Sequence, residues 1–283
     1  MVNDKHIGKV VLVELPNNSR PKYRWIVKKR DDGRYIARAP KIGVLIRDLD
    51  KKLEKEVNFF LKWGYLIIDK ALTDNQIVLL RKTFNKTFKK LKGKDHIDYN
   101  LFEYDKNFLF LLDNKPVIKR ISAILGNCIQ LHSASARLSS PGSKNQNWHR
   151  DGHWPVDPNG TPIGSIPGQI NCGYYLDPLT EQNGPIAIVP GSQKALFKPP
   201  KKDFEFPDQK IIYAKPGQAI IFNGWIYHRG LGNKSKSNRR VCLICYQNSW
   251  MKSRETFDGP IISKIKKSGS SLQKLLLGSV NKW

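Results

Sequence analysis

The chain has 283 residues, 40% of them hydrophobic and 10% aromatic, which is enough to bury a large core and excludes a disordered protein. Lysine and arginine number 49 against 24 aspartate and glutamate, and the net charge of +25 predicts attraction to anions such as nucleic acid, acidic lipid or an acidic small molecule. A lysine-rich soluble surface is the ordinary alternative. Zinc-finger spacing, an RRM-type aromatic motif and a basic zipper are all missing, so no specific nucleic-acid module is expected.

The remaining bulk features concern location. No apolar run reaches the roughly 18 residues that span a bilayer, and the first residues lack the apolar stretch of a signal peptide. The four cysteines are scattered and form no disulfide framework. A cytoplasmic location is therefore the expectation.

Residues 1–56 are predicted to be a basic N-terminal extension built of small hairpins. Residues 10–13 are typical of a strand, and two further β-forming runs flank Asp32-Gly33, a strong hairpin turn signal. These hairpins carry Lys22, Arg24, Lys28, Lys29, Arg30, Arg34, Arg38 and Lys41. The charges indicate either a solvated hairpin face or an anion-binding or membrane-surface patch, which would allow peripheral membrane association.

Residues 57–283 are predicted to form the main domain, and its first part is helical. Apolar spacing predicts an amphipathic helix that ends at Gly64, followed by a short buried strand. Thr73 and Gln76 have the spacing of a capping box that opens a second helix, and a third is expected over 117–125. We expect these helices to buttress a sheet.

After Gly126 the pattern changes to short strands separated by proline and glycine turns. The predicted strands are 129–138, 169–176, 186–189, 210–214, 219–222 and 240–247. This spacing, without helices between the strands, predicts an antiparallel barrel or jelly roll. Apolar residues interleaved with lysines after residue 271 predict a docked terminal helix, with a peripheral membrane anchor as the alternative.

A metal site is indicated by His149 and Asp151, two residues apart, together with the distant His228. A histidine and a carboxylate at i and i+2 suit a strand end, where both can face one ion, whereas on a helix they would diverge. Two histidines and one carboxylate on one face of a metal form the ligand set of non-haem Fe(II) oxygenases. His153 is an alternative to His149, although Gly152 before it suits a strand end better.

Arg239 stands at the start of an apolar strand that follows His228. A planar guanidinium beside the metal can bind the far carboxylate of a dicarboxylate co-substrate through two parallel hydrogen bonds. Arg240 is the alternative, but neighbouring residues on a strand point to opposite faces.

These segments together resemble the phytanoyl-CoA dioxygenase family of iron- and 2-oxoglutarate-dependent oxygenases. The resemblance rests on 148–152, on 176–178 leading to 183–194, on 216–228 and on 233–239, and it covers roughly residues 57 to 250. The block 183–194 is its most specific part.

The resemblance implies a mainly β fold with flanking helices, namely a double-stranded β-helix (a cupin-like jelly roll). His149, Asp151 and His228 take its iron positions, and Arg239 takes the position that binds the C5 carboxylate of 2-oxoglutarate, with O2 as the other co-substrate. The resemblance also makes His132 a candidate co-substrate ligand, with a core histidine as the alternative.

The family's site-facing aromatic would lie near Gly173, where this chain departs from the pattern. We therefore expect Asn171, Gly173 and Tyr175 to face the site, and Cys172 and Tyr174 to face away. By the same resemblance, Asn171 and Tyr175 are candidate contacts of the co-substrate.

Three further residues are candidates for substrate binding: Arg150, Arg137 and His153. The two arginines lie near the expected metal site and could bind a carboxylate or phosphate, or be ordinary surface charges. Cys242 and Cys245 have redox spacing, but in an apolar strand they are interpreted as core residues.

The sequence thus predicts a hydroxylase that acts on a small, anionic substrate and releases succinate and CO2. Halogenating relatives replace the carboxylate ligand with a small residue, so Asp151 favours hydroxylation or a related oxidation. Two alternatives remain: a non-catalytic jelly-roll protein that binds an anion or a membrane surface, and an oxygenase acting on an acidic lipid or glycolipid at the membrane.

Overall fold

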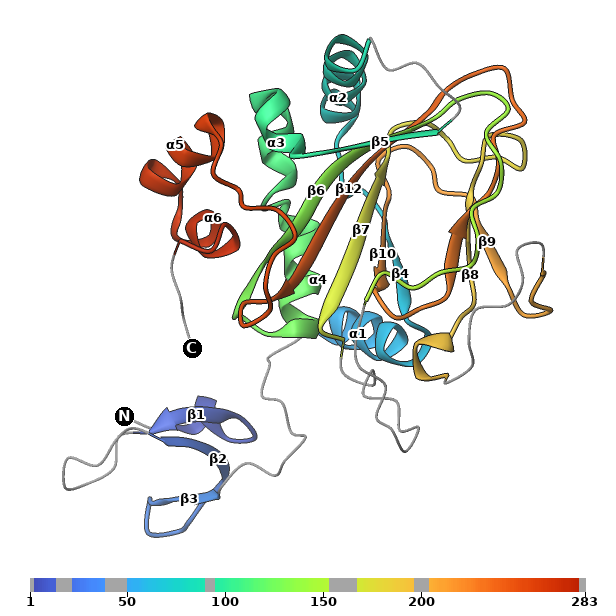
Figure 1. Cartoon of the computed structure of the whole chain (residues 1–283). Helices are drawn as coiled ribbons and strands as arrows, with labels where there is room; N and C mark the ends of the chain where they lie inside the picture. The colour runs from blue at the N-terminus through green and yellow to red at the C-terminus, as the bar shows by residue number, and fades with distance from the viewer. Residues whose placement is uncertain are drawn as a thin grey trace. The chain divides into compact units, whose positions relative to one another are not determined.

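The computed structural model describes residues 3–13, 22–38, 50–89, 95–152, 167–195 and 204–279. The chain divides into two compact units, Met1–Lys52 and Leu53–Trp283, and each is described by itself (Figure 1). Among the helices in the described ranges, none combines the length and apolar character needed to cross a bilayer.

The smaller unit contains a three-stranded antiparallel sheet in the order β1-β2-β3. Its elements are η1 (Asp4–His6), β1 (Val10–Val13), β2 (Lys22–Lys29) and β3 (Tyr35–Arg38). The β2–β3 hairpin turns at Gly33, whose φ of 79° favours glycine, so the predicted hairpin is confirmed.

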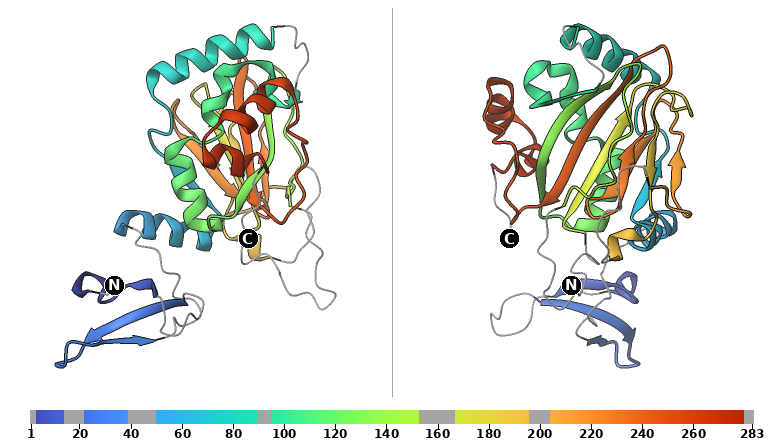
Figure 2. Two further views of the ribbon diagram at one scale, coloured as in Figure 1. Left: turned by 90° about the vertical axis from the view of Figure 1, so that its left-hand side faces the viewer. Right: turned by 45° about the vertical axis from the view of Figure 1, so that its right-hand side comes forward.

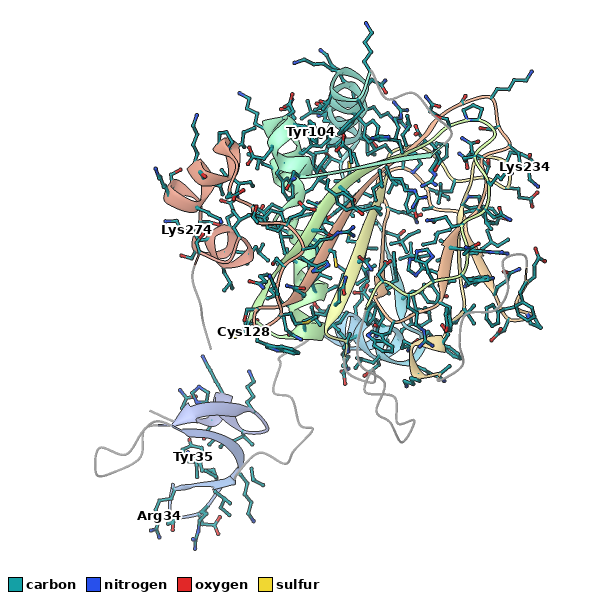
Figure 3. The ribbon with its side chains drawn as sticks, in the orientation of Figure 1. Arg34, Tyr35, Tyr104, Cys128, Lys234 and Lys274 are labelled. Carbon is teal, nitrogen blue, oxygen red and sulfur yellow. The ribbon has the colours of Figure 1, made fainter. Side chains whose placement is uncertain are left out.

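Some basic residues of this unit pair with acidic neighbours. Lys29 lies 3.2 Å from a carboxylate oxygen of Asp4. Arg34, which Figure 3 labels, lies 2.7 Å from a carboxylate oxygen of Asp32. The side chains of Lys22, Arg24 and Arg38, and all of Lys41, lie outside the described residues. The anion- or membrane-binding patch stays a prediction.

The larger unit is built on two antiparallel sheets. The six-stranded sheet has the order β4 (Tyr65–Ile68), β10 (Ala219–Asn223), β7 (Gln169–Tyr175), β12 (Arg239–Asn248), β6 (Ile129–Ser139) and β5 (Asp95–Tyr99). The three-stranded sheet has the order β11 (His228–Gly230), β8 (Ile186–Ile188) and β9 (Lys210–Ile212). Neighbouring strands are far apart in sequence because the chain crosses between the sheets, as in a jelly roll. The predicted strands are confirmed, and β5 and β11 are two that the sequence did not predict.

Helices cover one face of the six-stranded sheet, and the smaller sheet faces the other (Figures 1 and 2). The helical elements are α1 (Lys51–Trp63), α2 (Asp74–Thr87), α3 (Leu101–Tyr104), η2 (Lys106–Leu111), α4 (Lys115–Leu125), α5 (Pro260–Ser268) and α6 (Ser271–Leu276), and η4 (Ser192–Lys194) follows β8. Strand alternation divides the core accordingly. Tyr174 and Ile221 pack with the helices, whereas Tyr175 and Ile220 pack between the sheets. The buttressing role predicted for the helices is confirmed.

Local signals explain where the first two helices stop and start. Gly64 follows α1 with a φ of 81°, and its backbone N–H donates to the Phe60 carbonyl, as expected for a glycine C-cap. Thr73 and Gln76 form the predicted capping box at the start of α2, with bonds of 3.3 Å and 2.9 Å between side chains and backbone N–H groups. The third predicted helix begins two residues earlier than expected, at Lys115, because Asn114 caps it.

An irregularity in β6 matters for the site. Cys245 of β12 pairs with Ser133, but the next residue, Tyr246, pairs with Leu131. His132 is therefore an extra residue, a β-bulge in the strand that borders the cavity described below. Bulges bend a strand and redirect the side chains beside them.

Candidate active site

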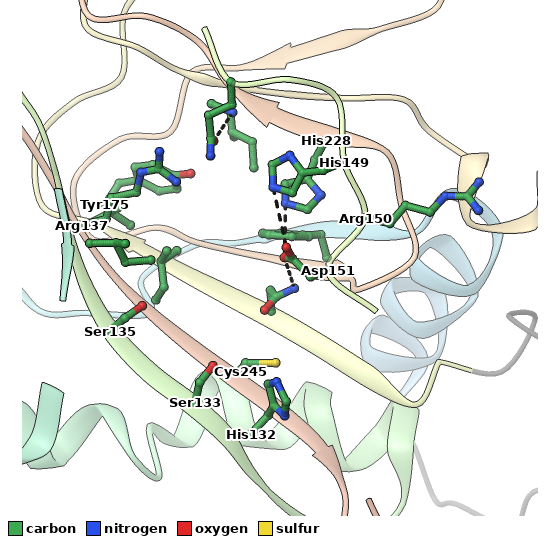
Figure 4. A pocket seen from close by; sticks show the side chains of 18 of the residues that line it. His132, Ser133, Ser135, Arg137, His149, Arg150, Asp151, Tyr175, His228 and Cys245 are labelled. Atoms are coloured by element: carbon green, nitrogen blue, oxygen red, sulfur yellow. Dashed lines mark hydrogen bonds and ion pairs between the residues drawn. The ribbon is translucent and has the colours of Figure 1, made fainter. Parts of the chain in front are cut away.

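The candidate site is centred on His149, Asp151 and His228, which the fold brings together from two segments. His149 and His228 exchange backbone hydrogen bonds of 3.1 Å in each direction, which fixes one histidine opposite the other. The backbone N–H of Asp151 donates to the Gly224 carbonyl at 2.8 Å, so Asp151 is held beside the turn between β10 and β11 that leads to His228. One ligand atom from each of the three side chains lies within 4.8 Å of the others (Figure 4).

The orientation of each imidazole is set by a backbone carbonyl. Nδ1 of His149 lies 2.8 Å from the Asn147 carbonyl, and Nδ1 of His228 lies 3.1 Å from the Ile226 carbonyl. Because a carbonyl only accepts, Nδ1 carries a hydrogen in both rings, and the Nε2 atom of each is turned toward Asp151. This is the arrangement that orients histidines toward a metal.

The carboxylate is also fixed by a partner. The side-chain amide of Asn171 donates to Oδ2 of Asp151 at 2.9 Å. The same oxygen lies 3.3 Å from Nε2 of His228, and Oδ1 lies 3.7 Å from Nε2 of His149. The Asp151 carboxylate is thus the common partner of Asn171, His149 and His228, and the dashed lines in Figure 4 meet at it.

The electrostatics of the cluster favour an ionised Asp151. Burial acts to raise its pKa, but His228, His149 and Arg137 outweigh burial and lower the pKa to about 2. Burial and the nearby His228 lower the pKa of His149, whereas Asp151 overcomes burial and raises the pKa of His228. The site thus offers a charged oxygen and two imidazole nitrogens to a cation.

These three residues fit a divalent metal. Metal–ligand bonds of about 2.1 Å at right angles place neighbouring donor atoms about 3.0 Å apart. The two separations from Asp151, 3.3 Å and 3.7 Å, are slightly longer, and all three donor atoms lie within 4.8 Å of one another, so side-chain rotations would close the set around an ion. Two histidines and a carboxylate on one face leave the opposite face open, which is the arrangement of non-haem iron sites.

A cavity of about 250 Å³ opens beside the three ligands, between the two sheets. Arg239 lines it and is buried at the start of β12, where its Nη2 donates to the Ser139 hydroxyl at 2.7 Å. Its guanidinium lies 5.8 Å from the centre of the Tyr175 ring. Arg240 points to the opposite face and pairs with Asp177, so the expected alternation is confirmed.

The other residues predicted for co-substrate binding also reach the cavity. Asn171, Tyr175 and His132 line it, while Cys172 and Tyr174 pack in the core on the far face of β7. Burial lowers the pKa of His132, which favours a neutral ring.

The departure at Gly173 has a steric reason. A Cβ at this position would lie 3.0 Å from Cε2 of Tyr175, so the tyrosine ring occupies the space beside Gly173.

The predicted substrate residues differ in where they point. Arg137 lies on β6 beside Tyr175 and faces the cavity (Figure 4). Arg150 borders the cavity, but its guanidinium points away from the three ligands and donates to the carbonyls of Ser192 and Ala195 (Figure 4). His153 lies outside the described residues.

The sequence did not single out several residues that line this cavity. The polar ones among them are Tyr99, Ser133, Ser135, Gln146, Gln169 and Arg254. Tyr99 belongs to the unpredicted β5, and Arg254 follows β12, so neither carried a local signal. Cys242 and Cys245 are buried free thiols, and burial raises the pKa of both, in agreement with a core role; Cys245 also borders the cavity.

Comparisons with known proteins place this site in a family. The family model described as phytanoyl-CoA dioxygenase matches residues 60–241. L-proline trans-4-hydroxylase of Streptomyces griseoviridis is 26% identical over 128 residues, covering 35% of this chain and 47% of that protein. A probable alpha-ketoglutarate-dependent hypophosphite dioxygenase of Stutzerimonas stutzeri is 25% identical over 122 residues, covering 43% and 39%. The chain thus spans less than half the length of these relatives.

Solved structures agree on the fold. HygX from Streptomyces hygroscopicus, with nickel and 2-oxoglutarate bound, has a TM-score of 0.63 at 14% identity, covering 73% of this chain and 90% of HygX. The non-haem alpha-ketoglutarate-dependent carbocyclase SnoK has a TM-score of 0.57 at 16% identity, covering 71% and 85%. The predicted double-stranded β-helix is confirmed. With its family match over residues 60–241, the chain belongs to the phytanoyl-CoA dioxygenase family.

Proposed function

We propose that this protein is an Fe(II)- and 2-oxoglutarate-dependent oxygenase that hydroxylates a small, anionic organic substrate and releases succinate and CO2. One observation carries the proposal: the ligand atoms of His149, Asp151 and His228 lie within 4.8 Å of one another, in the same cavity as the buried Arg239. Family membership supports the same reaction class.

Each residue has a part in this proposal. His149, Asp151 and His228 would hold Fe(II), which supplies the activation of O2 that couples decarboxylation of 2-oxoglutarate to oxidation of the substrate. Arg239, with the Ser139 hydroxyl at 2.7 Å, would bind the far carboxylate of 2-oxoglutarate. Tyr175 borders the same end of the cavity and would contact the co-substrate.

The protein's own contribution is orientation and exclusion of water. The Nδ1 contacts to backbone carbonyls keep the histidine Nε2 atoms turned inward, and Asn171 keeps the carboxylate from rotating. Phe222, Val241 and Leu243 supply apolar wall to the cavity, which limits the water that can reach the reacting groups. Asp151 occupies the carboxylate position, so hydroxylation is proposed over halogenation.

The anionic character of the substrate rests on charge. Of the described residues that line the cavity, four are arginines (Arg137, Arg150, Arg239 and Arg254) and one is an acid, Asp151, although the Arg150 guanidinium is turned toward the carbonyls of Ser192 and Ala195. The names of two relatives agree with this proposal, because L-proline carries a carboxylate and hypophosphite is an oxyanion.

The test begins without a known substrate. Whole chain is mixed anaerobically with Fe(II) and 2-oxoglutarate, and the near-visible absorption of the chelate is recorded. We expect a band in the wild type and none in Asp151→Ala, whereas Asp208→Ala, a change at an exposed aspartate, should behave as the wild type.

Succinate formation with O2 is then measured against a panel of anionic metabolites. Folded wild-type protein that neither binds iron nor consumes 2-oxoglutarate would contradict the proposal and favour a non-catalytic jelly roll. Normal succinate formation by iron-loaded Asp151→Ala would contradict the assigned ligand set.

A further inference from the structure

The wall of the cavity formed by β5 and β6 has polar side chains, and the Arg254 side chain from another segment lies beside it. Tyr99 of β5 and Ser133 and Ser135 of β6 line it, and Arg254 reaches it from the segment after β12. Arg254 also lies beyond residue 241, where the family match ends.

The bulge in β6 positions this segment. The carbonyl of His132, the extra residue, accepts hydrogen bonds from the backbone N–H groups of Arg254 at 3.0 Å and Glu255 at 3.3 Å. In a regular strand that carbonyl would accept a hydrogen bond from the neighbouring strand, whereas in a bulge it can accept one from another segment. The irregularity in β6 thus holds the backbone of Arg254 at the cavity edge.

Side chains on both sides of Arg254 anchor the same segment. The carboxylate of Glu255, which is 8% exposed, accepts from the backbone N–H of Ala134 at 2.8 Å and of Asn100 at 3.2 Å. The Ser253 hydroxyl donates to the Leu131 carbonyl at 2.6 Å. Because the backbone is held from both sides, Arg254 loses less conformational freedom on binding a ligand than an arginine on a loose loop would.

The guanidinium of Arg254 is itself oriented. Its Cζ lies 4.2 Å from the centre of the Tyr99 ring, a cation–π contact. A guanidinium has five N–H donors, so contact with one ring leaves donors for a ligand. Among the residues that the structure describes, no carboxylate forms an ion pair with Arg254.

Arg254 is separated from the arginine assigned to 2-oxoglutarate. Arg239 pairs with Ser139 at one end of β6, whereas the Arg254 segment is bonded to His132 near the other. Tyr99, the ring that the Arg254 guanidinium contacts, pairs with Ser135 of β6. Ser135 and Ser139 are four strand residues apart, about 13 Å. The two arginines therefore serve different parts of the cavity.

We propose that Arg254, stacked on Tyr99, binds an oxyanion of the substrate, a carboxylate or a phosphate, and that the hydroxyls of Ser133 and Ser135 line the path from that group to the metal ligands. The inference rests on the proposed oxygenase function, since it names the residue that selects the substrate of that same site.

The test uses three probes with one aromatic body: benzoate, phenyl phosphate and the neutral benzamide. Their binding to the full chain is measured by calorimetry, with and without Fe(II) and 2-oxoglutarate under anaerobic conditions. Arg254→Gln removes the charge and planar fork, and Lys252→Gln removes one charge from an exposed residue of the same segment that does not line the cavity.

We expect one of the two anions to bind at least about tenfold more tightly than benzamide, and Arg254→Gln to lose about tenfold of that affinity, as for a charge-assisted hydrogen-bonded pair. Lys252→Gln should match the wild type. A preference for benzoate or for phenyl phosphate identifies which oxyanion the site takes.

Equal binding of all three probes, no binding of either anion, or unchanged anion binding in Arg254→Gln would overturn the inference. The arms without metal separate this outcome from failure of the oxygenase proposal. Anion binding that depends on Arg254 in a chain that forms no iron–2-oxoglutarate chelate would contradict the oxygenase and leave the anion site standing.

Discussion

Asn171 is the residue for which the structure and the sequence suggest different roles. The resemblance placed it among co-substrate contacts, but its amide donates to Asp151 Oδ2 at 2.9 Å. If this bond holds the carboxylate ready for the metal, Asn171→Ala should weaken metal binding. If Asn171 instead contacts 2-oxoglutarate, the same variant should weaken co-substrate binding and leave metal affinity intact.

The size of the effect follows from the bond. A hydrogen bond to an ionised carboxylate contributes about 1.5–3 kcal/mol, which corresponds to a loss of roughly 10- to 100-fold in metal affinity. Changes to residues that orient metal ligands have effects of about the same size. The bond is partly buried, at the edge of the cavity, so the lower end of the range is the expectation.

The assay is anaerobic competition between the protein and a chromophoric chelator for Fe(II), followed by titration of 2-oxoglutarate into metal-saturated protein. Asn58→Ala, at an exposed position on α1, is the matched control and should leave both affinities unchanged. Thermal unfolding checks that the Asn171 variant is folded. Metal affinity within twofold of the wild type, together with a weakened 2-oxoglutarate complex, would refute the role inferred from the structure and restore the one inferred from the sequence.

Two further predictions concern neighbouring charges. Arg239→Met should weaken 2-oxoglutarate binding by about 100-fold, because a bidentate charged pair is lost. Arg240→Met should leave that affinity unchanged and lower the free energy of unfolding, because Arg240 pairs with Asp177 on the other face. Equal effects of both changes on 2-oxoglutarate titrations would be incompatible with the assigned strand faces. Burial raises the pKa of Glu255 from 4.5 to about 7, so its contribution to stability is full below pH 4.5 and declines as pH rises toward about 7, by up to about 3 kcal/mol. Urea unfolding of the wild type and Glu255→Gln across this pH range measures it, and the reasoning fails if the stability difference between the two proteins does not change with pH.

Local pattern was sufficient for much of the fold and for the metal ligands. Short runs separated by proline and glycine turns identified most strands. Side chains in a strand point to opposite faces with a period of two. The same period separated Arg239 from Arg240 and Tyr175 from Tyr174. His149 and Asp151, two residues apart, indicated a metal site without any knowledge of distant contacts.

The parts that escaped prediction depend on pairing between distant segments. β5 has a polar sequence and is a strand because β6 accepts it as an edge partner. The bulge at His132 exists only in the register between β6 and β12, which no property of either strand alone reveals.

For the site, the sequence by itself determined which residues can ligate a metal and which face of each strand they occupy, because residue chemistry and strand period are local. Only the tertiary structure decided that Asn171 bonds to Asp151 and that Arg254 stacks on Tyr99 at the cavity edge. Both contacts join segments that are distant in the sequence and come together only when the sheets assemble. The spacing of residues along the chain does not predict such contacts.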